Sequence, residues 1–159
     1  MTRTLIVFLL GAVVGAAVLG LVMQNQAASM MLVEDFSVLD FDATVQSIQD
    51  EALAAGWKVP SVHTISKSVE GAGYDVLPVT VIELCSASIA GRALSDDEGR
   101  HVAPMMPCRV AVYETSDGKV VISRMNSPLM SKFFGGIIEE VMTQAAVENE
   151  EIFGPVLGH

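Results

Sequence analysis

The sequence predicts an α+β domain: an antiparallel sheet of four to five strands with two helices on one face (β-α-β4-α), preceded by one transmembrane helix. Three observations lead to this prediction. An uncharged apolar run stands near the N-terminus, strand-like and helix-like segments alternate after it, and an Asp-Gly pair joins two of the strands. Strands flanked by helices are typical of a sheet that buries one face under those helices.

The composition excludes one class of function and limits the number of domains. The chain has 159 residues, with 9 Lys and Arg against 19 Asp and Glu, and a formal net charge of −10. A nucleic-acid backbone needs a basic surface, so no nucleic-acid partner is expected. The length allows one domain with an appendage. We divide it into an anchor over residues 1–28 and an exported domain over residues 29–159.

The apolar run from Leu5 to Met23 is interpreted as an uncleaved membrane anchor. Its nineteen residues carry no charge, and they are enough to cross a hydrocarbon core of roughly 30 Å at about 1.5 Å per residue. Arg3 precedes the run and the next basic residue is Lys58. The positive-inside rule then predicts a single-pass protein of the inner (cytoplasmic) membrane with its C-terminal domain in the periplasm. The alternative is a cleaved signal peptide, whose apolar core is usually shorter, about 7–15 residues.

The first helix of the exported domain is predicted from its cap and its periodicity. Asp40 or Asp42 can cap it, because a carboxylate accepts hydrogen bonds from the free N–H groups of the first turn. Gly56 provides a C-terminal stop. The apolar positions follow the helical period and comprise Phe41, Val45, Ile48, Ala52 and Ala55.

Five segments rich in β-branched residues are predicted as strands. The clearest alternation begins at Cys108, and the Asp117-Gly118 pair after that strand is typical of a tight hairpin, since glycine accepts positive φ. The predicted strands in chain order are Met30–Ser37, Val59–Ser66, Val79–Leu84, Cys108–Glu114 and Val120–Met125.

Two further helices are predicted. Ser86–Leu94 is a short one, and the last begins at Ser127-Pro128, a capping serine followed by proline at the first helical position. Gly135-Gly136 lies inside that last helix, where each glycine costs on the order of 1 kcal/mol relative to alanine, so we expect close packing or a bend there. The acidic stretch Ser95–Gly99 is expected to be a solvated turn, and the acidic stretch Glu148–Glu151 a solvated tail.

The two cysteines of the chain mark the candidate site. Cys85 follows the third predicted strand and Cys108 begins the fourth. The end of one antiparallel strand lies beside the start of the next, so the two sulfurs are expected near each other. One interpretation is structural: a disulfide worth about 3 kcal/mol in an oxidising compartment, or simply two buried thiols.

Two chemical interpretations compete with the structural one. Thiol redox chemistry needs a thiolate stabilised by nearby positive charge, which Arg109 could supply. A soft-metal or haem-type site is the other, because thiolate and thioether sulfurs suit Cu(I), with imidazole as a further ligand. Copper is therefore the possible cofactor. Its candidate ligands are Cys85, His101, Met105, Met106 and Cys108.

No set of catalytic residues is recognisable, so a binding or assembly module is expected in preference to an enzyme. The sequence contains no Gly-rich phosphate loop, Ser-His-Asp pattern or H-E-x-x-H motif. Glu83, in an apolar strand, is expected at a sheet edge or paired with Arg109. A role as general base would need a second catalytic group, and none is recognisable in the sequence.

Several motifs stand between Glu83 and Asn126. They are Leu84-Cys85-Ser86, Met105-Met106-Pro107-Cys108-Arg109-Val110-Ala111-Val112-Tyr113-Glu114, Asp117-Gly118-Lys119 and Met125-Asn126. With these motifs the sequence resembles the family catalogued as domain of unknown function 302, from about Phe36 to Met142. The resemblance implies a TBP-like β-α-β4-α arrangement that is often dimeric, so a homodimer or a complex with a membrane or periplasmic protein is expected. It implies no catalytic residue. Glu83, Arg109 and Asn126 are kept as further residues of interest.

Overall fold

The computed structural model describes residues 11, 14–21, 29–95 and 97–158. The chain divides into two compact units, Met1–Met31 and Leu32–His159. The anchor predicted over Leu5–Met23 lies largely outside the described residues, and among those that are described no helix is both long and apolar enough to cross a membrane. Among the described residues, all five strands and the buried core belong to the second unit, as expected of a domain that folds on its own.

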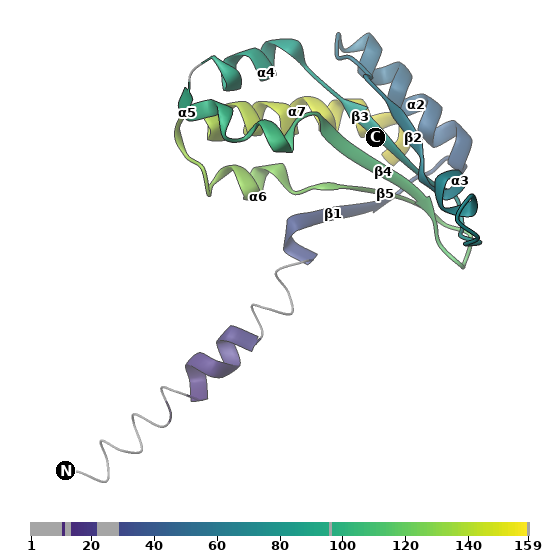
Figure 1. Ribbon diagram of the computed structural model, residues 1–159, viewed down its shortest axis with the longest axis horizontal. Helices are drawn as coiled ribbons and strands as arrows, with labels where there is room; N and C mark the ends of the chain where they lie inside the picture. The colour runs from purple at the N-terminus through teal and green to yellow at the C-terminus, as the bar shows by residue number, and fades with distance from the viewer. Residues whose placement is uncertain (1–10, 12–13, 22–28, 96, 159) are drawn as a thin grey trace, which may run out of the picture. The chain divides into compact units, whose positions relative to one another are not determined.

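The Leu32–His159 unit is built on a five-stranded antiparallel sheet, shown in Figure 1, which confirms the predicted α+β class. The strand order is β1-β5-β4-β3-β2, and every neighbouring pair is antiparallel. Three strands have the bounds that the sequence predicted, and the two edge strands are shorter. The strands are β1 (Leu32–Phe36), β2 (Val62–Thr64), β3 (Val79–Leu84), β4 (Cys108–Glu114) and β5 (Val120–Met125).

Helices cover one face of the sheet and continue past one end of its strands. The helix α2 contacts β3, β4 and α7, and α7 also contacts α4 and α6. In Figure 1, α4, α5 and α6 lie together at the end of the sheet opposite the turn between β4 and β5. The helices are α2 (Phe41–Ala54), α3 (Ile65–Glu70), α4 (Ala87–Leu94), α5 (Asp97–Arg100), the 3-10 helix η1 (Ala103–Met105), α6 (Ser127–Ser131) and α7 (Gly136–Leu157).

The first predicted helix is confirmed as α2, together with its cap. Asp40 Oδ1 accepts a hydrogen bond from the Ala43 N–H at 2.8 Å. Beyond the helix, Gly56 has φ of 80°, in the left-handed region that favours glycine. The chain then turns so that Trp57 is buried against the core, 3% exposed.

Two short segments differ from the prediction. The second strand was expected to reach Ser66, but β2 ends at Thr64 and the chain enters α3 at Ile65. As an edge strand, β2 pairs only with β3, so one ladder of hydrogen bonds holds it. The acidic stretch from Ser95, expected as a turn, contains the one-turn helix α5 from Asp97.

The predicted last helix is two helices, and the glycine pair separates them. Asn126, not Ser127, caps α6 by accepting from the Leu129 N–H at 3.2 Å. Gly135 and Gly136 have φ of 70° and 53°. Both values lie in the left-handed region, so the bend expected at this pair is a complete break between α6 and α7.

Residues Glu148–Glu151, expected as a solvated tail, are part of α7, which continues to Leu157. Glu150 and Glu151 are exposed, as expected. Ile152, Phe153 and Val156 are buried in the core, with exposed fractions of 2%, 0% and 0%. These apolar residues hold the last turns of the helix against the sheet. The acidic residues therefore lie within a helix that has buried residues both before and after them.

A sulfur-lined cavity as the candidate functional site

A cavity of about 610 Å³ lies at the end of the sheet where β3 and β5 end and β4 begins. Its floor is made by strand ends, and its other walls come from α4, from the segment around η1 and from α7. Most of the lining is apolar. Representative residues of these walls are Leu84, Val110, Ile89, Val102, Pro104, Val141, Ala145 and Ala146.

The cavity owes part of its volume to the small residues of α7. Residues three and four apart lie on the same side of a helix, so Val141, Met142, Ala145, Ala146 and Asn149 form one stripe, and all five line the cavity. The two alanines are 6% and 9% exposed. Their methyl groups leave the space that longer side chains would fill at a close-packed interface.

Both cysteines line this cavity as free thiols, so the disulfide considered from the sequence is not formed. The register explains why. Leu84, not Cys85, is the partner of Cys108 across the β3–β4 pair. Cys85 stands one residue beyond the directly opposed pair, so the two cysteines do not face each other across the ladder. The backbone of Cys85 is fixed by Lys58, with which it exchanges two hydrogen bonds of 2.8 and 2.9 Å.

The environment of Cys108 favours its neutral form. Burial raises the pKa of the Cys108 thiol, and the nearby Cys85 raises it further. A redox nucleophile needs the opposite, a thiolate stabilised by positive charge. Arg109, which could supply that charge, instead has its Nε 3.4 Å from Glu83 Oε1.

The cavity brings together four of the five candidate copper ligands. Cys85, Met105, Met106 and Cys108 line it. His101 does not: its Nδ1 is hydrogen-bonded to the Glu98 carbonyl oxygen, and its ring lies 5.9 Å from that of Phe134.

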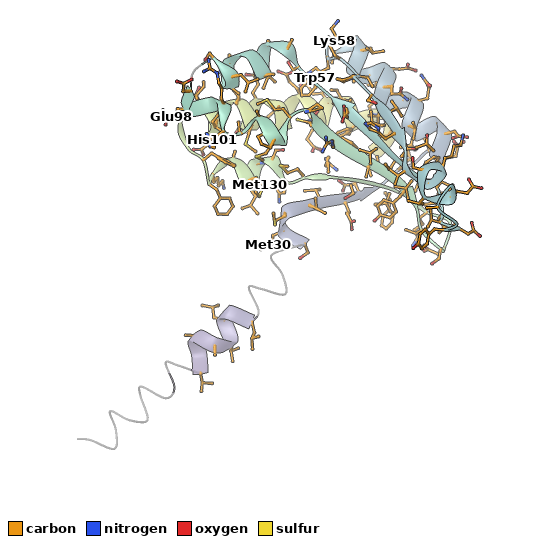
Figure 2. The ribbon with its side chains drawn as sticks, viewed as in Figure 1. Met30, Trp57, Lys58, Glu98, His101 and Met130 are labelled. Atoms are coloured by element: carbon orange, nitrogen blue, oxygen red, sulfur yellow. The ribbon has the colours of Figure 1, made fainter. Side chains whose placement is uncertain are left out.

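Figure 2 shows His101 beside Glu98 at the end of the domain that α5 forms. Without His101, the atoms in the cavity that could bind a soft metal ion are the sulfurs of cysteine and methionine. In the described part of the chain, no group of three or more His, Cys, Asp or Glu side chains is arranged to hold a metal ion. Sequence reasoning missed Met125 and Met142, which also line the cavity, because they stand far from the cysteines along the chain.

The remaining predicted residues have structural partners. Glu83 Oε1 lies 3.4 Å from Arg109 Nε and 3.4 Å from His63 Nε2. The predicted Glu83–Arg109 pair is thereby confirmed. Asn126 lines the cavity and also caps α6.

A charged cluster in the wall of the cavity, formed by Arg124 and Glu150 together with Asp35, was not predicted. Arg124, whose side chain is 10% exposed, places its Nη1 2.7 Å from Asp35 Oδ2 and its Nη2 2.7 Å from Glu150 Oε1. Its guanidinium also lies over the Phe153 ring at 5.0 Å. The sequence signal for this cluster was an arginine within an apolar strand. Its two partners could not be identified from the sequence because they lie 89 and 26 residues away.

Known proteins support the fold. Residues 34–152 match the family model described as domain of unknown function DUF302. The fold is similar to the crystal structure of an uncharacterized conserved DUF302 protein from Bacillus stearothermophilus, with 16% identity and a TM-score of 0.71 over 80% of this chain and 98% of that one. At this identity the likeness shows the fold alone. No curated protein matches the chain.

Proposed function

We propose that this chain, which belongs to the DUF302 family, is a binding module whose cavity holds a small, mostly apolar ligand. The observation that carries the proposal is the cavity itself. Its volume of about 610 Å³ falls within the roughly 300–1,000 Å³ that is usual for small-molecule sites. Such sites combine apolar walls with a few polar groups, and this lining has that composition.

The size of the cavity favours a function over imperfect packing. Protein interiors are close-packed and contain few voids larger than a water molecule. Here a half-open pocket, backed by the almost fully buried Leu84, Ile89 and Val110, leaves a space that would hold a molecule of many atoms. A domain that keeps such an apolar space beside its core is suited to binding a ligand.

We propose further that Leu5–Met23 tethers this module to the inner membrane with the domain in the periplasm. The support is the uncharged run and the single Arg3 before it. At about 3.5 Å per residue, the eight residues from Gln24 to Met31 reach at most about 28 Å. The module would stay close to the bilayer, where apolar molecules partition.

A second candidate function, binding of Cu(I), is favoured by the sulfur content of the cavity. Thiolate and thioether ligands select soft ions. Methionine in a cavity wall also fills space as an apolar side chain, so the metal must be tested directly. The sulfur-bearing lining residues are Cys85, Met105, Met106, Cys108, Met125 and Met142.

Filling the cavity should weaken binding of an apolar probe. We expect the 32–159 unit to bind 2-methoxynaphthalene, measured by isothermal titration, and Ala145→Leu to weaken binding by about tenfold or more, because the added side-chain atoms occupy the ligand's space. The matched control is Val147→Leu, which enlarges a residue of the same helix that is 57% exposed. Equal binding by wild type and Ala145→Leu, or no binding by wild type, would refute the proposed cavity function.

The tether is tested by fusing alkaline phosphatase after the last residue and fractionating the cells. The fusion should be active, because this phosphatase folds only outside the cytoplasm, and it should stay with the membranes after carbonate washing. Deleting Leu5–Met23 should leave an inactive fusion in the cytoplasm. An inactive full-length fusion, or an active one released in soluble form, contradicts the tether.

Copper binding has a pH signature that follows from the raised pKa of Cys108. A metal must displace the thiol proton, so the apparent Cu(I) affinity should rise with pH until the pH exceeds that raised pKa. Anaerobic titration of the 32–159 unit against a competing chelator measures this. Cys108→Ser should remove the site, whereas His101→Ala, outside the cavity, should leave it intact. Absence of stoichiometric Cu(I), or full binding by Cys108→Ser, eliminates this candidate.

A further inference from the structure

The wall that α7 contributes to the cavity contains a polar side chain whose hydrogen bonds the protein leaves incomplete. Asn149 lines the cavity, and its Oδ1 is shielded from solvent with no donor among the described residues. Within that part of the chain, no other buried side-chain nitrogen or oxygen lacks a partner. Buried polar atoms are almost always hydrogen-bonded, so this exception calls for an explanation.

The neighbours of Asn149 along the helix hold it in this position. Trp57 Nε1 donates to Glu148 Oε2 at 2.7 Å. On the other side, Arg124 Nη2 donates to Glu150 Oε1 at 2.7 Å. These two attachments fix the rotation of α7 about its axis. Together they keep this face of α7 directed at the cavity, although Asn149 as a whole residue is partly exposed.

The space along α7 leads to this amide. Ala145 and Ala146 stand four and three residues before Asn149, and all three line the cavity. On a helix these positions share one face. A ligand lying against the two alanine methyl groups therefore meets the carboxamide one turn further along.

We infer that the ligand is an apolar molecule bearing a hydroxyl group, and that the hydroxyl is hydrogen-bonded to the Asn149 amide. A hydroxyl both donates and accepts, so it matches the amide whichever end faces the cavity, and rotation about χ2 brings Oδ1 to face it. The thioether and apolar walls surround the rest of the molecule. This inference rests on the proposed function, since it names the class of ligand for the same cavity.

The test compares two probes of similar shape on the 32–159 unit, 2-naphthol and 2-methoxynaphthalene, by isothermal titration at pH 7. The methoxy compound lacks the donor. We expect wild type to bind 2-naphthol about fivefold more tightly, the ratio that one net hydrogen bond provides. Asn149→Leu should bind both probes with equal affinity. Equal binding of the two probes by wild type, or an unchanged preference in the variant, overturns the inference.

A control and a second readout separate ligand recognition from a structural role. Glu151→Gln changes an exposed polar residue of the same helix that does not line the cavity and should keep the preference for 2-naphthol. Without any probe, Asn149→Leu should unfold at the same or a higher temperature, because it removes an unpaired buried amide. Asn149→Ala, which adds no bulk, is measured in parallel. Lower unfolding temperatures in both variants would assign Asn149 a structural role and overturn the inference.

Failure of the inference and failure of the proposed function give different results. If both probes bind equally and Ala145→Leu weakens both, the cavity binds ligands but does not recognise a hydroxyl. If neither probe binds wild type, the proposed function fails and the inference fails with it.

Discussion

The attachment of α7 to the sheet is the constraint on which the rest of the domain depends. Arg124 projects from β5 into a position that is almost closed to solvent, and a charge so placed must be paired. It lies between Asp35 of β1 and Glu150 of α7, with the Phe153 ring beneath it. One side chain thus joins an edge strand, a central strand and the longest helix of the unit.

The cavity follows from how α7 is held along its length. Its last turns are fixed by buried Ile152, Phe153 and Val156, and Trp57 secures the next turn through Glu148. Toward its start, α4 and α6 contact it instead of the sheet. Between these two regions α7 presents alanines to the strand ends, and the segments after β3 and β5 close the sides. The cavity therefore results from the fold and does not depend on any single loop.

Sequence reasoning predicted the parts of the domain that local patterns control. The bounds of β3, β4 and β5 come from β-branched runs and a hairpin glycine, and α2 from its Asp40 cap. The closeness of Cys85 and Cys108, at the end of β3 and the start of β4, also followed from strand order.

The parts that sequence reasoning missed depend on partners distant in sequence. The pairing of Glu148 with Trp57 and of Glu150 with Arg124 was missed because these partners are 91 and 26 residues away. The disulfide interpretation failed because proximity of two strand ends does not specify which faces the side chains occupy. No local sequence pattern marked Asn149, because the missing hydrogen-bond donor to its Oδ1 is a property of the folded chain.

The central claim is that the space between the strand ends and α7 is a preformed apolar cavity. Crystals of the 32–159 unit pressurised with xenon test it most directly, because xenon occupies apolar cavities in proteins. The account predicts xenon between Cys108 and Ala145, and none there in Ala145→Leu. A wild-type structure in which α7 has closed onto the strand ends, or in which the space admits no xenon, would contradict it.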